Sequence, residues 1–290
     1  MADKGAEDVG RGVLIIIGGH EDKSDRRTIL REVARRLKGG KLVIATVASH
    51  EPEGYFDSYQ EGFEGLDVGD LTEVYIEDRT QALDPEKLHA FEGAAGVFFT
   101  GGDQLRITSQ MGNTPIERRV REIYARGGVI AGTSAGASVM PETMLVSGSS
   151  RESYRIGDIS MAPGLGLIGG VIIDQHFAER GRIGRLLGAL AQNPRLLGIG
   201  IDEDTAIVID GGEFEVIGNG AVYVVDAAGV TQSNIAEERR DRALSIYDVR
   251  LHVLASGHAL DMEKRRPSHA PDLQQSQRLE QAALAQDDAA

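Results

Sequence analysis

The chain has 290 residues, of which 41% are hydrophobic and 26% charged, a balance typical of a globular protein with one large domain. It contains no cysteine, which excludes disulfides, thiolate metal ligands and a cysteine nucleophile. Its formal net charge of −14 disfavours sequence-independent binding of nucleic acid, which requires a basic surface. No apolar run approaches the roughly 20 residues of a membrane-spanning helix, and residues 1–12 carry no apolar signal-peptide core, so we expect a cytoplasmic protein without membrane association.

The first half of the chain alternates apolar runs with amphipathic stretches. Strands are predicted at residues 13–17, 41–48, 71–76, 97–100 and 129–131, and helices at about 24–37, 53–65, 85–92 and between 103 and 126. Ser24 is the expected N-cap of the first helix. Near-continuous apolar strands that alternate with helices indicate an α/β fold, with a mostly parallel sheet covered by helices on both faces.

Beyond residue 165 the pattern becomes richer in strands. Short apolar runs at 171–173 and 198–201 flank a helix near 183–192, a glycine-turn hairpin follows at 206–217, and further strands at 221–225 and 244–254 are expected to pair antiparallel. We therefore expect a β-rich C-terminal portion within a single α/β domain over residues 13–262. Residues 1–12 and the polar tail 263–290, which contains Pro267 and Pro271, are expected to be flexible.

Gly132-Thr133-Ser134-Ala135-Gly136 matches the G-x-S-x-G pattern of a nucleophile elbow. It lies between the predicted strand 129–131 and a run of small residues that begins a helix, where a sharp turn exposes the serine. The backbone N–H of Ala135 would then point at a developing oxyanion, and Gly102 or Asp103 in the turn after strand 97–100 would supply a second donor. The alternative is a glycine turn that only packs a helix on the sheet.

A serine nucleophile needs a general base, and the chain has seven histidines. His176 is favoured because it follows the buried strand 171–173 among polar residues. His20 and His50 also follow strand ends and stay open as candidates. A histidine in such a place is commonly structural, so the position alone does not assign the role.

The third member of such a system is a carboxylate that orients the imidazole. Asp202, Glu203 and Asp204 follow the strand 198–201, and by alternation the two aspartates face opposite to the glutamate. An acidic cluster at a strand end can also be a solvated loop. The chain order of serine, histidine and acid differs from the order in α/β-hydrolases, which makes an ordinary esterase or lipase the less natural interpretation.

Three arginines, Arg180, Arg182 and Arg185, follow His176 closely. Guanidinium groups bind carboxylates through paired hydrogen bonds, so next to a catalytic base they would favour a substrate with free carboxylates. The alternative is the basic first turn of a solvated helix.

Taken together, these motifs resemble cyanophycinase. The matching segments are 16–23, 99–104, 132–137, 174–185 and 200–206, in the same order along residues 13 to 260. The resemblance implies a fold akin to class I glutamine amidotransferases and to peptidase E, a homodimer, and no cofactor or metal. It also implies a serine exopeptidase that hydrolyses cyanophycin, a polyaspartate with arginine on each side-chain carboxyl, to β-Asp-Arg dipeptides.

Position by position, the resemblance makes Ser134 the nucleophile, His176 the base and Glu203 the acid. The positions that match the substrate pocket of the family are Gln104, Asp174, Gln175, Arg180, Arg182 and Arg185. His20 is a departure, since a small residue is expected between Gly19 and Glu21. Two alternatives remain: an aspartyl dipeptidase like peptidase E, and a non-catalytic binding protein with the same fold.

Overall fold

The computed structural model describes residues 12–148, 159–237 and 242–269. The strands are β1 (Val13–Ile17), β2 (Lys41–Ala45), β3 (Leu71–Val74), β4 (Ala94–Phe99), β5 (Val129–Thr133), β6 (Thr143–Ser147), β7 (Ser160–Pro163), β8 (Val171–Gln175), β9 (Leu197–Ile201), β10 (Thr205–Asp210), β11 (Glu213–Gly218), β12 (Ala221–Asp226), β13 (Arg250–Ala255), β14 (His258–Asp261) and β15 (Arg266–His269). The helices are α1 (Thr28–Leu37), α2 (Tyr55–Phe63), the 3-10 helix η1 (Arg79–Leu83), α3 (Pro85–His89), α4 (Gln104–Met111), α5 (Pro115–Ala125), α6 (Ala135–Ser138) and α7 (Ile183–Gln192). Residues 1–11 and 270–290, for which flexibility is predicted, lie outside the described residues.

The largest sheet has nine strands in the order β15-β14-β11-β10-β1-β5-β4-β2-β3. Five neighbouring strands of this sheet run parallel, in the order β1-β5-β4-β2-β3. The other four, β10, β11, β14 and β15, pair antiparallel. The protein is therefore a mixed α/β fold, and the prediction of a mostly parallel sheet is confirmed only for its N-terminal half. The antiparallel half follows from its short connections, because a tight turn such as Gly211-Gly212 can join only antiparallel neighbours.

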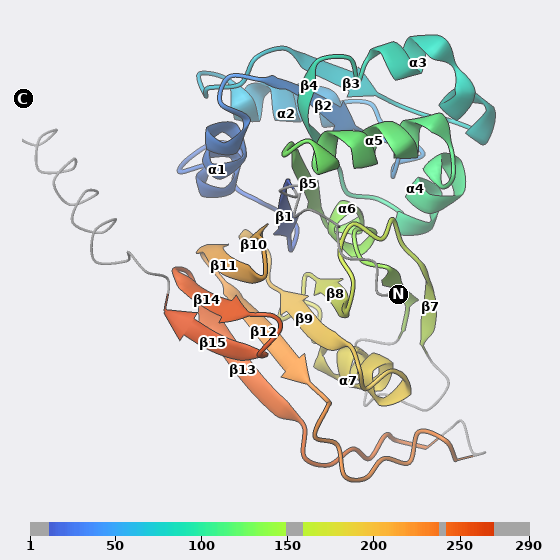
Figure 1. Ribbon diagram of the computed structural model, residues 1–290, viewed down its shortest axis with the longest axis vertical. Coiled ribbons are helices and arrows are strands. Elements are labelled where there is room, and N and C mark those ends of the chain that lie inside the picture. Colours follow the sequence, from blue (N-terminus) through green and yellow to red (C-terminus); the bar gives the residue numbers. More distant parts are fainter. Residues whose placement is uncertain (1–11, 149–158, 238–241, 270–290) are drawn as a thin grey trace, which may run out of the picture.

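Alternate residues of the parallel strands face two separate hydrophobic cores. Leu14 and Ile16 of β1 belong to one core together with residues of α4 and α5, whereas Ile15 and Ile17 belong to the other together with residues of α1 and α2. Figure 1 shows these helices gathered around the blue and green strands, while the orange and red strands of β10 to β15 occupy the other half of the view. Helices thus cover both faces of the parallel half.

A second sheet has four strands in the order β13-β12-β9-β8. Its strands β8 and β9 run parallel, so their C-terminal ends lie at the same edge, and α7 joins them. β6 and β7, which the sequence did not predict, form a separate antiparallel pair. None of the described helices is long and apolar enough to span a membrane.

Two predicted boundaries are wrong. Regular structure continues past residue 262, because β15 pairs with β14 at the open edge of the large sheet. Pro267 is tolerated there since an edge strand does not need every backbone N–H for pairing. Ser24 is not the N-cap of α1: the helix starts four residues later, after Arg27, and the Ser24 N–H donates to Asp22 Oδ1.

Candidate active site

The predicted elbow turns sharply between β5 and α6. Ser134 has φ 54° and ψ −110°, a conformation that a side-chain-bearing residue rarely adopts, and its N–H donates to the Ile17 carbonyl oxygen at 3.1 Å. Small neighbours are required, since a β-carbon at Gly136 would lie 2.4 Å from the Phe99 carbonyl oxygen. The serine hydroxyl is thereby held out at the C-terminal edge of the sheet.

The structure brings Ser134, His176 and Glu203 together. His176 Nε2 lies 3.0 Å from Ser134 Oγ, and His176 Nδ1 lies 2.6 Å from Glu203 Oε1. The imidazole comes directly after β8 and the carboxylate soon after β9, so the parallel pairing of these strands places both at one edge. The His176 N–H donates to the Gly18 carbonyl oxygen at 2.8 Å, which fixes the ring against the loop after β1.

The two aspartates beside Glu203 have other partners. Asp202 accepts hydrogen bonds from the backbone N–H groups of Ala178 and Ala221. Asp204 accepts from the N–H of Asp22 at 2.8 Å and from the side chain of Asn219. The acidic cluster is thus divided between two loop-fixing carboxylates and one that bonds with the imidazole.

The protonation states of the pair suit acid–base chemistry. Burial lowers the pKa of His176, the nearby charge of Arg180 lowers it further, and the hydrogen bond with Glu203 opposes both. Burial acts to raise the pKa of Glu203, but the hydrogen bond with His176 and the nearby charges of His20, His176 and Arg180 together outweigh it, so the pKa is lowered. Near neutral pH the imidazole is therefore a free base beside an ionised carboxylate.

The predicted oxyanion donors divide into two groups. The Asp103 N–H donates to the Ala48 carbonyl oxygen at 2.8 Å, and the Asp103 side chain caps α4, so this residue is wrongly predicted as a donor. Gly102 has φ 141°, and a β-carbon there would lie 2.3 Å from the Ala48 carbonyl oxygen. The glycine turn lies against Ser134, since a β-carbon on Gly101 would be 3.5 Å from Ser134 Cβ. Gly102 and Ala135 remain as the candidate backbone donors.

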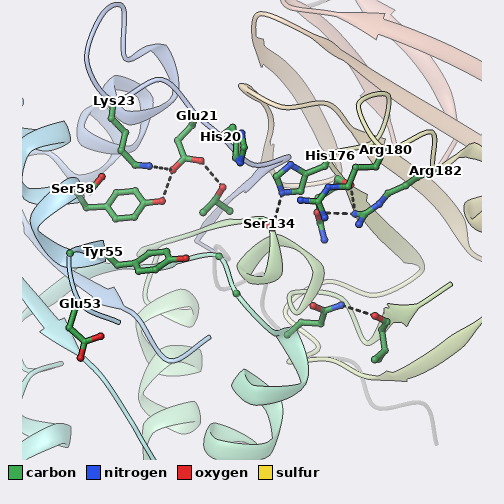
Figure 2. Close-up of a pocket in the computed structure, with 18 of the residues that line it drawn as sticks. His20, Glu21, Lys23, Glu53, Tyr55, Ser58, Ser134, His176, Arg180 and Arg182 are labelled. Carbon is green, nitrogen blue, oxygen red and sulfur yellow. Dashed lines mark hydrogen bonds and ion pairs between the residues drawn. The ribbon is translucent and has the colours of Figure 1, made fainter. Parts of the chain in front are cut away.

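A cavity of about 690 Å³ opens onto Ser134. In Figure 2, Arg180 and Arg182 lie to one side of the serine, while Glu53, Tyr55 and Ser58 lie at the opposite end. The cavity therefore offers a basic end and an end that combines a carboxylate with an aromatic ring.

The three arginines after His176 differ in their contacts. Arg185 bonds with both oxygens of the fully buried Asp174, and Arg182 donates to the backbone and side-chain oxygens of Gln175. Burial lowers the pKa of Arg182 to about 10, although Asp174 opposes this. Arg180 is exposed and lines the cavity. The basic end thus consists of a buried, internally bonded pair behind one accessible guanidinium.

Gln104 and Gln175, also predicted as pocket residues, line the cavity and are held by protein partners. Gln104 Nε2 donates to the Leu145 carbonyl oxygen at 2.8 Å, and Gln175 Nε2 lies 3.3 Å from Ser138 Oγ. Each amide is therefore oriented before any ligand enters.

Two further residues lie beside the site: His20, an open candidate for the base, and Glu21, to which the sequence assigned no role. His20 Nδ1 lies 3.2 Å from Glu203 Oε2, and its ring meets that of His176 edge-on with centroids 5.1 Å apart. Glu21 is buried and accepts hydrogen bonds from Tyr59 Oη at 2.5 Å and from Thr133 Oγ1 at 2.6 Å, so it supports the residue before the serine. Both lie in the loop after β1 and within the segment 16–23 that carries part of the family resemblance.

His50 is the other open candidate for the base, and its Nδ1 lies 3.2 Å from Arg106 Nη1. Its partner is thus an arginine rather than the serine.

Comparison with known proteins identifies the family. The model of peptidase family S51 matches residues 14–217. The chain belongs to this family of serine peptidases. It is similar to a cyanophycinase from Geminocystis herdmanii (strain PCC 6308), with 39% identity over 261 residues that cover 89% of this chain and 96% of the relative.

Solved structures agree on the fold. A peptidase from an acI-B1 Actinobacterium superposes with a TM-score of 0.64 at 21% identity, and covers 88% of this chain and 98% of its own. A putative peptidase E protein from Listeria monocytogenes EGD-e gives a TM-score of 0.51 at 15% identity, covering 72% of this chain and 100% of its own.

Proposed function

We propose that this S51 peptidase is an exopeptidase that hydrolyses cyanophycin to β-Asp-Arg dipeptides through an acyl-enzyme on Ser134. The observation that carries the proposal is the hydrogen-bonded series from Ser134 through His176 to Glu203, open to a cavity with a basic end. The similarity to cyanophycinase over most of both chains supports the substrate.

In this mechanism Ser134 Oγ attacks the carbonyl carbon of a backbone peptide bond while its proton passes to His176 Nε2. Glu203 stabilises the imidazolium through its bond with Nδ1, and the N–H groups of Gly102 and Ala135 stabilise the oxyanion. The imidazolium then gives its proton to the leaving amine. A water molecule, deprotonated by the same imidazole, attacks the ester carbon, and the carboxylate product leaves as the proton returns to Ser134.

The basic end would receive carboxylate groups of the substrate. Arg180 is the accessible guanidinium, and Arg182 with Arg185 adds positive charge from behind because one Asp174 carboxylate balances only one of them. We further propose that residues 13–269, which include β15, act as a single hydrolytic domain in a cytoplasmic homodimer; the resemblance to cyanophycinase supports the dimer.

The test is mass spectrometry of the products after incubation of the purified protein with insoluble cyanophycin. β-Asp-Arg should form with the parent chain and fall by at least about a thousandfold with Ser134→Ala, because the acyl-forming hydroxyl is gone. Ser109→Ala is the control, since Ser109 is exposed on α4 and its hydroxyl donates to the Arg106 carbonyl oxygen of the same helix, so the substitution removes no contact with the site.

Intact polymer in all samples, together with cleavage of short aspartyl peptides, would replace this proposal with a dipeptidase. Equal turnover by parent and Ser134→Ala would remove the serine mechanism.

A further inference from the structure

Outside the series that leads to Ser134, a second imidazole lies beside the acid. The Glu203 carboxylate lies between two histidine rings, with Oε1 at 2.6 Å from His176 Nδ1 and Oε2 at 3.2 Å from His20 Nδ1. Figure 2 shows the His20 ring standing next to that of His176. The proposed mechanism needs only one of these two imidazoles.

The three side chains together have the donor set of a transition-metal site. His20, His176 and Glu203 each offer one ligand atom, and these atoms lie within 4.8 Å of one another. Two imidazoles and one carboxylate are a common zinc set, whereas Mg²⁺ and Ca²⁺ prefer oxygen ligands alone. With zinc bonds of about 2.0–2.1 Å, two tetrahedral ligand atoms are about 3.3 Å apart, close to the spacing of His20 Nδ1 and Glu203 Oε2.

Backbone hydrogen bonds hold together the loops that carry the three ligands. The carbonyl oxygens of Gly18 and Gly19, just before His20, accept hydrogen bonds from the N–H groups of His176 and Asp204. The loop that carries His20 is thus fixed to the loops that carry the other two ligands. The His20 side chain itself is 71% exposed, so its ring can move the short distance that coordination requires without disturbing the core.

We propose that His20, His176 and Glu203 bind Zn²⁺ and that the bound ion switches off the serine. Zinc on His176 Nδ1 takes the place of the hydrogen there, and the one hydrogen of the neutral ring then resides on Nε2. Nε2 has no lone pair left for the Ser134 hydroxyl, so the ring cannot act as the base. The ion leaves with a chelator, and the hydrogen returns to Nδ1. Inhibition rests on the proposed hydrolytic function, whereas zinc binding does not.

The first experiment measures binding alone. Zn²⁺ is titrated calorimetrically into full-length Ser134→Ala protein prepared without a polyhistidine tag, with and without His20→Ala. We expect one site per chain, weakened at least tenfold by His20→Ala. The matched control is His89→Ala. His89 is the last residue of α3, and its Nδ1 lies 3.1 Å from Glu92 Oε2, a similar histidine–glutamate pair for which the described residues offer no third ligand. This control should leave the affinity unchanged.

The second experiment measures hydrolysis with the serine present. The ratio of rates with and without Zn²⁺ should fall at least tenfold in the parent, recover on addition of a chelator, and change far less in His20→Ala. Zinc affinity that is equal with and without His20 in the first experiment overturns the site. Absence of hydrolysis by the zinc-free parent would count against the proposed function and leave the calorimetric result standing.

Discussion

His176 has to present a lone pair to the serine while its other nitrogen is held by an acid. Its position meets both needs, since Nε2 faces Ser134 Oγ and Nδ1 faces Glu203 Oε1. The ring is only 2% exposed, and burial disfavours its charged form. Burial therefore keeps the imidazole neutral, and so available as a base, near neutral pH, while the bond with Glu203 holds its orientation.

The pH profile follows from the same groups. Catalysis needs neutral His176, whose pKa is lowered from its ordinary 6.5, so the acid limb of kcat/KM is expected below pH 6.5. Glu203→Gln removes the hydrogen bond that holds the pKa up, so the limb should move to still lower pH while kcat falls by about 10²–10⁴. Rates between pH 4.5 and 8 test this. An unmoved limb in Glu203→Gln, or a moved one in the surface control Glu92→Gln, would contradict it.

Arg180 and Arg182 are expected to respond differently to substitution. Arg180→Gln should raise KM about fivefold to tenfold with little change in kcat or thermal stability, because the guanidinium is exposed and is proposed to bind carboxylates of the substrate. Arg182→Met should cost about 1–3 kcal/mol of stability, because it leaves the buried oxygens of Gln175 without their donor. Kinetics at pH 8, where His176 is neutral in all variants, and thermal unfolding separate the two. A KM unchanged in Arg180→Gln would make that residue a surface charge.

At the scale of elements, the loop after β1 positions the imidazole. Gly19 has φ 108°, and a β-carbon on it would lie 2.3 Å from His176 Cε1 and 2.6 Å from His176 Nε2. Only glycine leaves room for the ring while its carbonyl oxygen bonds with the Asp204 N–H. This loop therefore sets the distance between the base and the serine.

Gly19→Ala is accordingly predicted to impair catalysis more than folding. The added methyl group displaces the ring from Ser134, so kcat should fall at least a hundredfold. Gly211→Ala is the control: Gly211 has φ 75° but open space around it, so it should cost only about 1 kcal/mol of stability and leave kcat intact. Comparison of kcat with the denaturation midpoint decides, and similar kcat in the two variants would contradict the role of the loop.

The elements differ in how far the sequence predicts them. The apolar runs of β1 and β5 predict the place of the elbow, because a buried parallel strand needs continuous apolar residues. The small residues around Ser134 then leave room for the sharp turn between β5 and α6. The pairing of β9 with β12 in a separate sheet could not be predicted from the sequence, because it depends on contacts between residues distant along the chain. For the same reason the sequence left Asp103 as an oxyanion donor, although a distant carbonyl oxygen on Ala48 occupies its N–H.

On the scale of the whole molecule, the site lies where the two sheets meet. Ser134 follows β5 of the nine-stranded sheet, whereas His176 and Glu203 follow β8 and β9 of the four-stranded sheet. Only residues 202–204 separate β9 from β10, which returns to the large sheet and pairs antiparallel with β1. Neither sheet alone contains the residues that the proposed chemistry requires, so activity depends on how the two are joined.

This arrangement predicts one cooperative transition that removes structure and activity together. Ile207 of β10 is fully buried opposite Ile16 of β1, where the N-terminal and C-terminal halves pair. Ile207→Ala should cost about 2–5 kcal/mol, because it leaves a cavity in the core that both halves share. Far-UV circular dichroism and residual hydrolysis, followed through the same urea series, should therefore shift to lower midpoints by the same amount. If activity were lost at a urea concentration that leaves most of the secondary structure intact, the four-stranded sheet would unfold on its own, and residues 13–269 would not be a single domain.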